Sequence, residues 1–182
     1  MSEDLLIKYC APTMANIKTA NLFSCSFTSH QELINDVRYL NNRLKHKGIR
    51  VLALKYTDGR GLIYVYRPGR LSEDLRDCRA CSLLKQCGYP GFDENMCLRH
   101  LIQRLDENAD FPHEIGLFLG YPPEDVYGFI HKKKECKLCG FWKVYGDVEK
   151  AKKQFARFRK CSELYWKQWQ TGKSLEHLTV TV

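Results

Sequence analysis

Cysteine is the residue type with the widest chemical range in this chain of 182 residues, which contains nine of them. Four of the nine form two CxxC pairs, Cys78–Cys81 and Cys136–Cys139, and CxxC is the commonest ligand spacing for tetrahedral zinc. The first pair, however, lies in a helix-like run, and the 54 residues between the pairs exceed the length of a compact zinc ribbon. We therefore predict no metal site and expect most of the cysteines to be small buried side chains with free thiols.

Cys10 and Cys161 are the two candidates for a reactive thiol. Pro12 disfavours helical backbone at the preceding residue, so the sequence predicts that a first helix stops near Cys10 and that another begins soon after it. A following helix N-terminus and a nearby cation, here Lys8, both stabilise a thiolate. Cys161 follows Arg157 by one helical turn, which would bring a guanidinium close to its sulfur. For both thiols the alternative is packing at a helix boundary.

His113 and Glu114 form the only adjacent pair of histidine and carboxylate in the segment Phe111–Phe129, which is rich in Gly and Pro. Imidazole titrates near neutral pH, and a neighbouring carboxylate is typical of acid–base catalysis. Neighbours in a helix, however, point about 100° apart, so the two side chains need not share a site. The alternative is that both bind backbone groups in the first turn of a helix.

The positive charge of the chain is concentrated near its C-terminus. Residues 131–160 hold eleven Lys/Arg and three Asp/Glu, a net charge of +8, whereas the rest of the chain is neutral. The lysines of this segment alternate with aromatic residues, and such a mixture could combine phosphate contacts with base stacking. The residues concerned are lysines 132–134, Lys137 and Lys143, with Phe141, Trp142 and Tyr145. A nucleic-acid-binding module over residues 132–167 is therefore an alternative function.

A long final helix, expected over residues 148–169, has an apolar stripe and a basic face. The basic face carries Lys150, Lys153, Arg157, Lys160 and Lys167. The same arrangement is typical of any solvated amphipathic helix, so it does not by itself indicate a ligand. A helix-turn-helix around Gly120 is disfavoured, because its second helix would present Glu124 and Asp125 to phosphates.

The composition predicts a folded scaffold for these residues. An apolar fraction of 44% with 27% charged residues is ordinary for a globular protein, and the length suits one domain over residues 1–182. We predict an α/β chain of the α+β type, in which a small mixed sheet that contains a β-hairpin packs with about six helices.

Periodicity and turn residues predict the order of these elements. In the first half we expect helices over residues 2–10, 13–20 and 29–47, strands over 21–27, 51–56 and 62–66, a helix end at Gly48 and a hairpin turn at 58–61. In the second half we expect helices over 72–86, 93–107 and 112–120, another that begins at Pro122, a strand over 141–145, the final helix, and an edge strand over 175–182.

The N-terminal sequence MSEDLLIKYC is acidic before it is apolar, which is the reverse of a secretory signal. Nowhere does the chain approach 18 uninterrupted apolar residues, the length that a membrane-spanning helix needs. We therefore expect a soluble cytoplasmic protein with reduced cysteines.

Three stretches of the chain resemble the pattern of a known family. They are CAPTMANIKTANLF at 10–23, FPHEIGLFLGYPPEDVYGFI at 111–130, and WKVYGD at 142–147 followed by FARFRKC at 155–161. Together they resemble the bacterial family called Domain of Unknown Function 3793, and the resemblance extends over almost the whole chain. No activity is assigned to that family, so the resemblance implies a set of positions and no reaction.

The resemblance implies a short list of positions within these blocks: Cys10, Lys18, His113, Glu114, Tyr121, Lys143, Tyr145 and Cys161. The candidates for binding are Lys18, Tyr121, Lys143, Tyr145, Arg157 and Cys161. Cys78 and Cys81 lie outside the blocks. Relatives tend to be encoded near flavodoxin and iron-uptake genes. The resemblance therefore implies a link to redox or iron metabolism and a flavodoxin as one possible redox partner, without identifying a cofactor.

Three functions remain open from the sequence. The first is an accessory protein or enzyme of redox or iron metabolism, with Cys10, His113 and Glu114 as catalytic candidates. The second is the nucleic-acid-binding module over residues 132–167. The third is a structural or interaction protein without catalysis.

Overall fold

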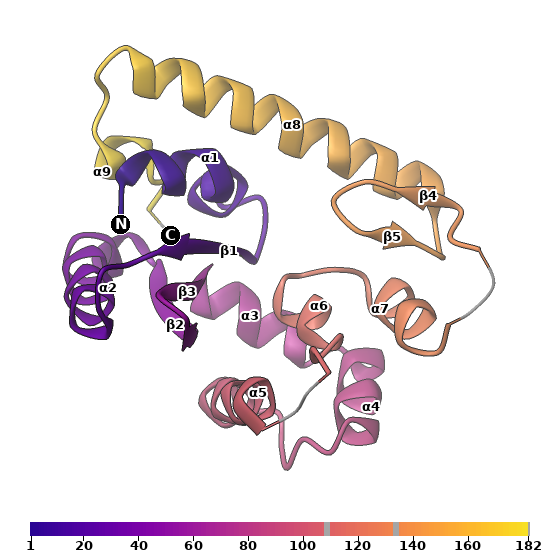
Figure 1. The fold of residues 1–182 in the computed structure, drawn as a ribbon. Coiled ribbons are helices and arrows are strands. Elements are labelled where there is room, and N and C mark those ends of the chain that lie inside the picture. Colours follow the sequence, from indigo (N-terminus) through magenta and orange to yellow (C-terminus); the bar gives the residue numbers. More distant parts are fainter. Residues whose placement is uncertain (108–109, 133–134, 182) are drawn as a thin grey trace. The chain divides into compact units, whose positions relative to one another are not determined.

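Figure 1 shows the helices and strands of the chain in a computed structural model. They fall into two units. The structure describes residues 1–107, 110–132 and 135–181. Backbone contacts assign residues 1–69 and 158–182 to unit 1 and residues 70–157 to unit 2. A mixture of helices and small sheets confirms the predicted α+β class. The assignment of the whole chain to one domain stays a prediction.

The sheet of unit 1 has three strands in the order β1-β3-β2, and both pairings are antiparallel. Its strands are β1 (Ala20–Ser26), β2 (Arg50–Thr57) and β3 (Arg60–Tyr66). Asp58 and Gly59 both have positive φ, 52° and 72°. Positive φ at both central residues is typical of the two-residue hairpin turn whose backbone twist matches that of the flanking strands. The predicted hairpin is therefore confirmed, and the sheet that contains it is antiparallel rather than mixed.

Helix α1 (Glu3–Met14) continues through Cys10 and contains Pro12 in its last turn. The predictions of a helix end near Cys10 and of a second helix over 13–20 are therefore wrong. Pro12 removes one backbone hydrogen bond, but the five residues from Cys10 to Met14 are all buried, and their packing offsets that loss. The helix ends instead at Met14, with Ala15 as its C-cap, and Asn16 follows with a φ of 55°.

Helix α2 (His30–Leu44) and the short 3-10 turn η1 (Lys45–Lys47) confirm the predicted helix over 29–47. Ser29 caps α2 by accepting a hydrogen bond from the backbone N–H of Glu32, and Gly48 ends the turn with a φ of 75°. The Asn41 side chain donates to the carbonyl of Val51 at 2.7 Å and accepts from its N–H at 2.9 Å. Helix α2 thereby covers part of the free edge of β2.

Arg67, directly after β3, joins three separate segments of unit 1. It is 2% exposed. Its guanidinium donates to the carbonyls of Thr13 and Met14 at 2.6 and 2.7 Å, and to those of Lys47 and Val180 at 3.1 and 2.8 Å. One buried side chain therefore holds the end of α1, the turn after α2 and the C-terminal tail together.

The tail forms helix α9 (Leu175–Leu178), so the predicted edge strand over 175–182 is wrong for the residues described. Ser174 caps α9 by accepting from the N–H of His177, and Leu175 and Leu178 are buried. The cap favours a helix turn over an extended strand. Beyond α9, the N–H of Val180 donates to the carbonyl of Met14 at 3.0 Å.

Unit 2 is built mainly from short helices. They are α3 (Pro68–Leu75), α4 (Cys78–Gln86), α5 (Glu94–Glu107), α6 (Ile115–Phe118) and α7 (Pro123–Ile130). The helix predicted over 72–86 is two helices, because Asp77 caps a new start at Cys78. The strand predicted over 141–145 is shorter: β5 (Lys143–Val144) pairs with β4 (Leu138–Cys139) in a small hairpin.

The long helix α8 (Val148–Gln170) confirms the predicted final helix and links the two units. Its residues Ala151, Phe155 and Phe158 are buried, as the apolar stripe predicts. In the described part of the chain, no helix combines the length and the apolar character needed to cross a membrane.

Replacing Arg67 with Met should lower the free energy of unfolding by about 3–5 kcal/mol, because several buried carbonyls lose a charged donor. Urea unfolding followed by far-UV circular dichroism measures the change. Arg60→Met is the matched control, since Arg60 is exposed on β3, and it should change stability by less than about 0.5 kcal/mol. A loss below about 1 kcal/mol for Arg67→Met would contradict the role given to this side chain.

Candidate functional site

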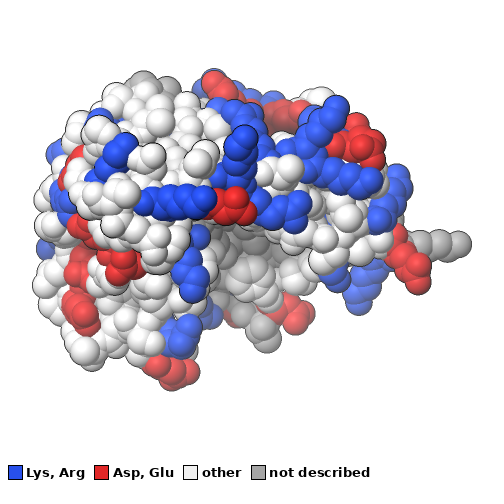
Figure 2. All heavy atoms as spheres, turned by 90° about the horizontal axis from the view of Figure 1, so that it is seen from above, with Lys and Arg blue, Asp and Glu red and all other residues white. Residues whose placement is uncertain are grey.

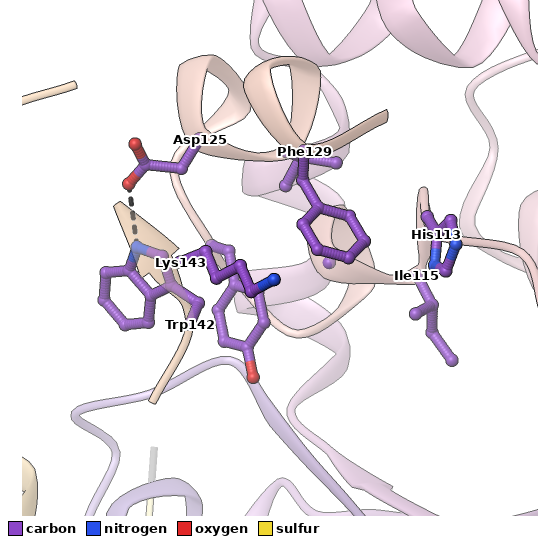
Figure 3. Close-up of a pocket in the computed structure, with 9 residues that line it drawn as sticks. His113, Ile115, Asp125, Phe129, Trp142 and Lys143 are labelled. Carbon is purple, nitrogen blue, oxygen red and sulfur yellow. Dashed lines mark hydrogen bonds between the residues drawn. The ribbon is translucent and has the colours of Figure 1, made fainter. Parts of the chain in front are cut away.

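Asp125, in the first turn of α7, organises the site in unit 2. Its carboxylate is 3% exposed and accepts three hydrogen bonds, each of 2.7 Å, from Trp142 Nε1 and from the backbone N–H groups of Tyr145 and Gly146. Figure 3 shows the bond to Trp142. Asp125 therefore fixes the β5 segment against α7, and it does not face outward as the helix-turn-helix argument assumed.

Two glycines allow this close packing. A side chain at Gly128 of α7 would place its Cβ 2.5 Å from the Cγ atom of Tyr145, and one at Gly146 would lie 2.8 Å from Glu124. Both positions therefore exclude larger residues while the neighbouring side chains stay in place. Tyr145 packs on the backbone of α7 and does not line the pocket described next.

Trp142 forms one wall of a pocket. Its ring stacks on Tyr121 with centroids 5.0 Å apart and meets Phe155 edge-on at 4.5 Å. Burial raises the pKa of Tyr121 to about 12, so its phenol is neutral at physiological pH. The two stacked rings give this wall a largely apolar surface, and Phe155 contacts Trp142 without lining the pocket.

Phe129, His113 and Lys143 also line the pocket. The His113 ring meets Phe129 edge-on, with centroids 4.8 Å apart and an interplanar angle of 88°. Lys143 Nζ lies 5.3 Å from the centroid of Phe129, within the range of a cation–π contact. In Figure 3, Phe129 lies between Lys143 and His113.

The pocket has a volume of about 200 Å³. Its lining consists of His113, Ile115, Gly116, Tyr121, Asp125, Val126, Phe129, Trp142 and Lys143. A cavity of roughly 150 Å³ can hold benzene, so this space suits one aromatic ring with a small substituent. Because the Asp125 charge is already satisfied by three donors, Lys143 provides the charge that a ligand would meet.

The structure separates the two members of the predicted acid–base pair. Glu114 is buried, forms an ion pair with Arg104 at 2.6 Å and accepts from the Tyr89 hydroxyl at 3.2 Å. Burial, and then the charge of Glu114, raise the pKa of Tyr89. His113 is exposed and belongs to the pocket. Although His113 and Glu114 are adjacent in the sequence, they therefore share no site and form no proton relay.

Cys10 lies in unit 1, in the interior of α1, and is 0% exposed. Burial raises the pKa of its thiol, and the nearby Lys18 only partly opposes that effect. Lys18 is itself buried and donates to the carbonyl of Ala20. The environment thus keeps Cys10 protonated, which is the opposite of the thiolate that a helix boundary would favour.

The remaining candidates lie apart from the pocket. Arg157 is exposed and Cys161 is half-buried, both on α8, and neither lines the pocket. Cys78 and Cys81 occupy the first turn of α4, where the Cys81 thiol donates to the carbonyl of Leu75 at 3.1 Å. No group of three or more His, Cys, Asp or Glu side chains is arranged to hold a metal ion within the described ranges.

Sequence reasoning selected His113, Tyr121 and Lys143 of the pocket, and named Trp142 only for base stacking in the nucleic-acid alternative. It missed Asp125 and Phe129 as site residues. A signal for Asp125 existed, because the indole N–H of Trp142 needs an acceptor when it is buried. The nearest acids in the family-like block, Glu124 and Asp125, were the available acceptors.

The profile of one protein family matches residues 6–179, and that family is described as Protein of unknown function (DUF3793). The chain belongs to this family. The match confirms the resemblance seen in the sequence and covers both units. Comparison with curated proteins and with solved structures found no match.

Asp125→Asn should destabilise the protein by about 2–4 kcal/mol, because the amide NH₂ must face a donor that the carboxylate now accepts. Urea unfolding measures this change, and hydrogen exchange at the Tyr145 and Gly146 amides reports whether β5 loosens. The control is Asp106→Asn, on the exposed side of α5. Unchanged exchange at both amides would contradict the anchoring role of Asp125.

Cys10 should react with iodoacetamide roughly 100-fold more slowly than Cys78, because its thiol becomes accessible only on unfolding. Mass spectrometry of peptides after timed alkylation measures both rates in one sample. Comparable rates at the two sites would restore Cys10 as a reactive thiol.

Proposed function

We propose that this protein is a binding protein for a small, planar, negatively charged molecule, which occupies the pocket of unit 2. The observation that carries the proposal is the Lys143 ammonium held 5.3 Å from the Phe129 ring at a pocket that aromatic side chains line. Such a site combines apolar contact for a ring with one cation for an anionic substituent.

The size of the pocket limits the ligand. A volume of about 200 Å³ suits one ring and excludes a larger cofactor as a fully enclosed ligand. The stacked rings of Tyr121 and Trp142 offer a flat surface, and aromatic pairs in such arrangements contribute about 0.5–1.5 kcal/mol beyond their buried area. A planar ring therefore fits better than a saturated one of similar mass.

Lys143 selects the charge of the ligand. A carboxylate or phosphate on the bound ring would pair with its ammonium while the ring contacts Phe129. The other charged group of the lining, Asp125, already accepts from three donors and does not compete for Lys143. A cationic ring would gain no such partner and would face Lys143 with like charge.

The thiol hypothesis has lost its local support, because Cys10 is buried in the middle of a helix and lies outside the pocket. A role in redox or iron metabolism, or with a flavodoxin, remains a prediction from the family resemblance.

The basic segment remains the basis of a second candidate function, nucleic-acid binding. On α8 the exposed cations include Lys150, Lys153, Arg157 and Lys160. Figure 2 shows Asp and Glu between the Lys and Arg side chains on the face in view, so positive charge there is not continuous. The charge on α8 alone therefore supports nucleic-acid binding less strongly than the pocket supports the binding of a small anion.

Benzoate and phenyl phosphate are the direct probes of the proposed site. Isothermal titration of the full chain should detect binding of both, with weaker binding of cyclohexanecarboxylate, which is not planar, and of benzylamine, which has the opposite charge. Lys143→Met should weaken benzoate binding about five- to tenfold, which corresponds to about 1–1.4 kcal/mol.

Lys153→Met is the matched control, because it removes an exposed lysine of unit 2 that does not line the pocket. It should leave the affinity for benzoate unchanged. Equal binding of benzoate and benzylamine, or an unchanged affinity of Lys143→Met for benzoate, would contradict the proposal.

A further inference from the structure

Three rings form a row on the surface of unit 2. Phe111 and Phe129 are 46% and 36% exposed, and His113 lies between them. The Phe111–His113 centroids are 6.3 Å apart and the His113–Phe129 centroids 4.8 Å apart. The two exposed phenylalanines, each in ring contact with His113, give this surface flat groups on which other planar groups can pack.

The row is continuous with the pocket. Phe129 and His113 line the pocket as well as belonging to the row, whereas Phe111 lies outside the lining. A chain of flat groups bound along the row would thus reach the pocket with one of its members. The spacing of the rings falls within the separation at which aromatic groups pack on one another.

The carboxylates of the segment that carries the row are already engaged. Glu114 pairs with Arg104 at 2.6 Å, Glu124 pairs with Arg79 at 3.2 Å, and Asp125 is buried among its three donors. They therefore add little negative potential to the surface of the row. Asp110 remains exposed beside Phe111.

The segment that follows the row is strongly basic. By sequence, residues 131–145 carry five lysines and one acid, Glu135. Lys132, Lys137 and Lys143 are exposed, and Lys143 contacts Phe129 of the row itself. A ligand with regularly spaced negative charges therefore meets Lys143 beside Phe129, and the other two lysines follow the row in sequence.

We infer that unit 2 binds single-stranded nucleic acid along Phe111, His113 and Phe129, with one base in the pocket and a neighbouring phosphate at Lys143. Flat bases joined by phosphates match exposed rings beside lysines, and stacking on aromatic side chains is the sequence-tolerant mode of single-strand binding. A duplex fits less well, because its bases stack on one another and leave no face for the row.

The placement of one base in the pocket rests on the proposed function. The inference differs from the hypothesis of a nucleic-acid-binding module over residues 132–167, because the rings of 111–129 provide the contact surface and the lysines add to it. An acidic peptide would satisfy the lysines but would have no stacking groups for the row, so it serves as a discriminating competitor.

Fluorescence anisotropy of the full chain with 5′-labelled ten-residue oligo(U) and oligo(dT) tests the inference. Both should bind at 50 mM salt and bind more weakly at 200 mM salt, since each phosphate contact contributes to the salt dependence. A duplex of the same length and polyglutamate should compete at least about tenfold less well, because neither offers stacking bases.

Phe111→Ala separates this inference from the proposed function. It should weaken oligonucleotide binding about fivefold or more, the effect of losing one base-stacking ring. It should leave benzoate binding unchanged, because Phe111 does not line the pocket. Phe129→Ala should weaken both. Tyr39→Ala removes an exposed ring of unit 1 and should change neither. Circular dichroism shows whether each variant is folded.

Three results would overturn the inference. One is the absence of oligonucleotide binding at 50 mM salt while benzoate still binds, which leaves the proposed function intact. Another is an unchanged oligonucleotide affinity in Phe111→Ala, and the last is equal competition by polyglutamate, which would assign the binding to charge alone. Absence of both oligonucleotide and benzoate binding would remove the two proposals together.

Discussion

One carboxylate determines the geometry of the candidate site. Asp125 accepts from the Trp142 indole and from two successive backbone N–H groups, and each hydrogen bond to a charged acceptor is worth about 1.5–3 kcal/mol. Without it, the two-residue strand β5 would depend on its short pairing with β4. The position of Trp142, and with it the stacked Tyr121 and the base of Lys143, follows from this single side chain.

Unit 1 uses the same principle with the opposite charge. Arg67 is buried and donates to carbonyls from α1, from the turn after α2 and from the tail. In both units a buried ionic group satisfies backbone groups at places where regular secondary structure ends. Such a group joins segments that hydrophobic burial alone would leave free to slide, because hydrogen bonds have direction and apolar contact does not.

Local signals in the sequence predicted the elements whose ends are set by nearby residues. Ser29 and Gly48 mark the ends of a helix, Asp58 and Gly59 mark the hairpin, and Pro123 marks the start of α7. The predictions of secondary structure were wrong where contacts with residues distant in the sequence outweigh the local preference of the backbone. Pro12 stays helical because its neighbours are buried.

The same distinction applies to the site. Sequence position identified His113, Tyr121 and Lys143, which the structure brings to one pocket. The partner of Glu114 could not be predicted, because Arg104 comes from a different helix. The burial of Cys10 could not be predicted for a similar reason, since side chains from the rest of unit 1 surround its thiol and raise its pKa.

The Asn41 side chain has a consequence for the behaviour of the protein in concentrated solution. By donating to and accepting from Val51, it occupies backbone groups on the free edge of β2 that could otherwise pair with a strand of another molecule. The irregularity between Ala53 and Lys55 interrupts the same edge a few residues later. The small sheet is thereby shielded on this side against growth into intermolecular aggregates.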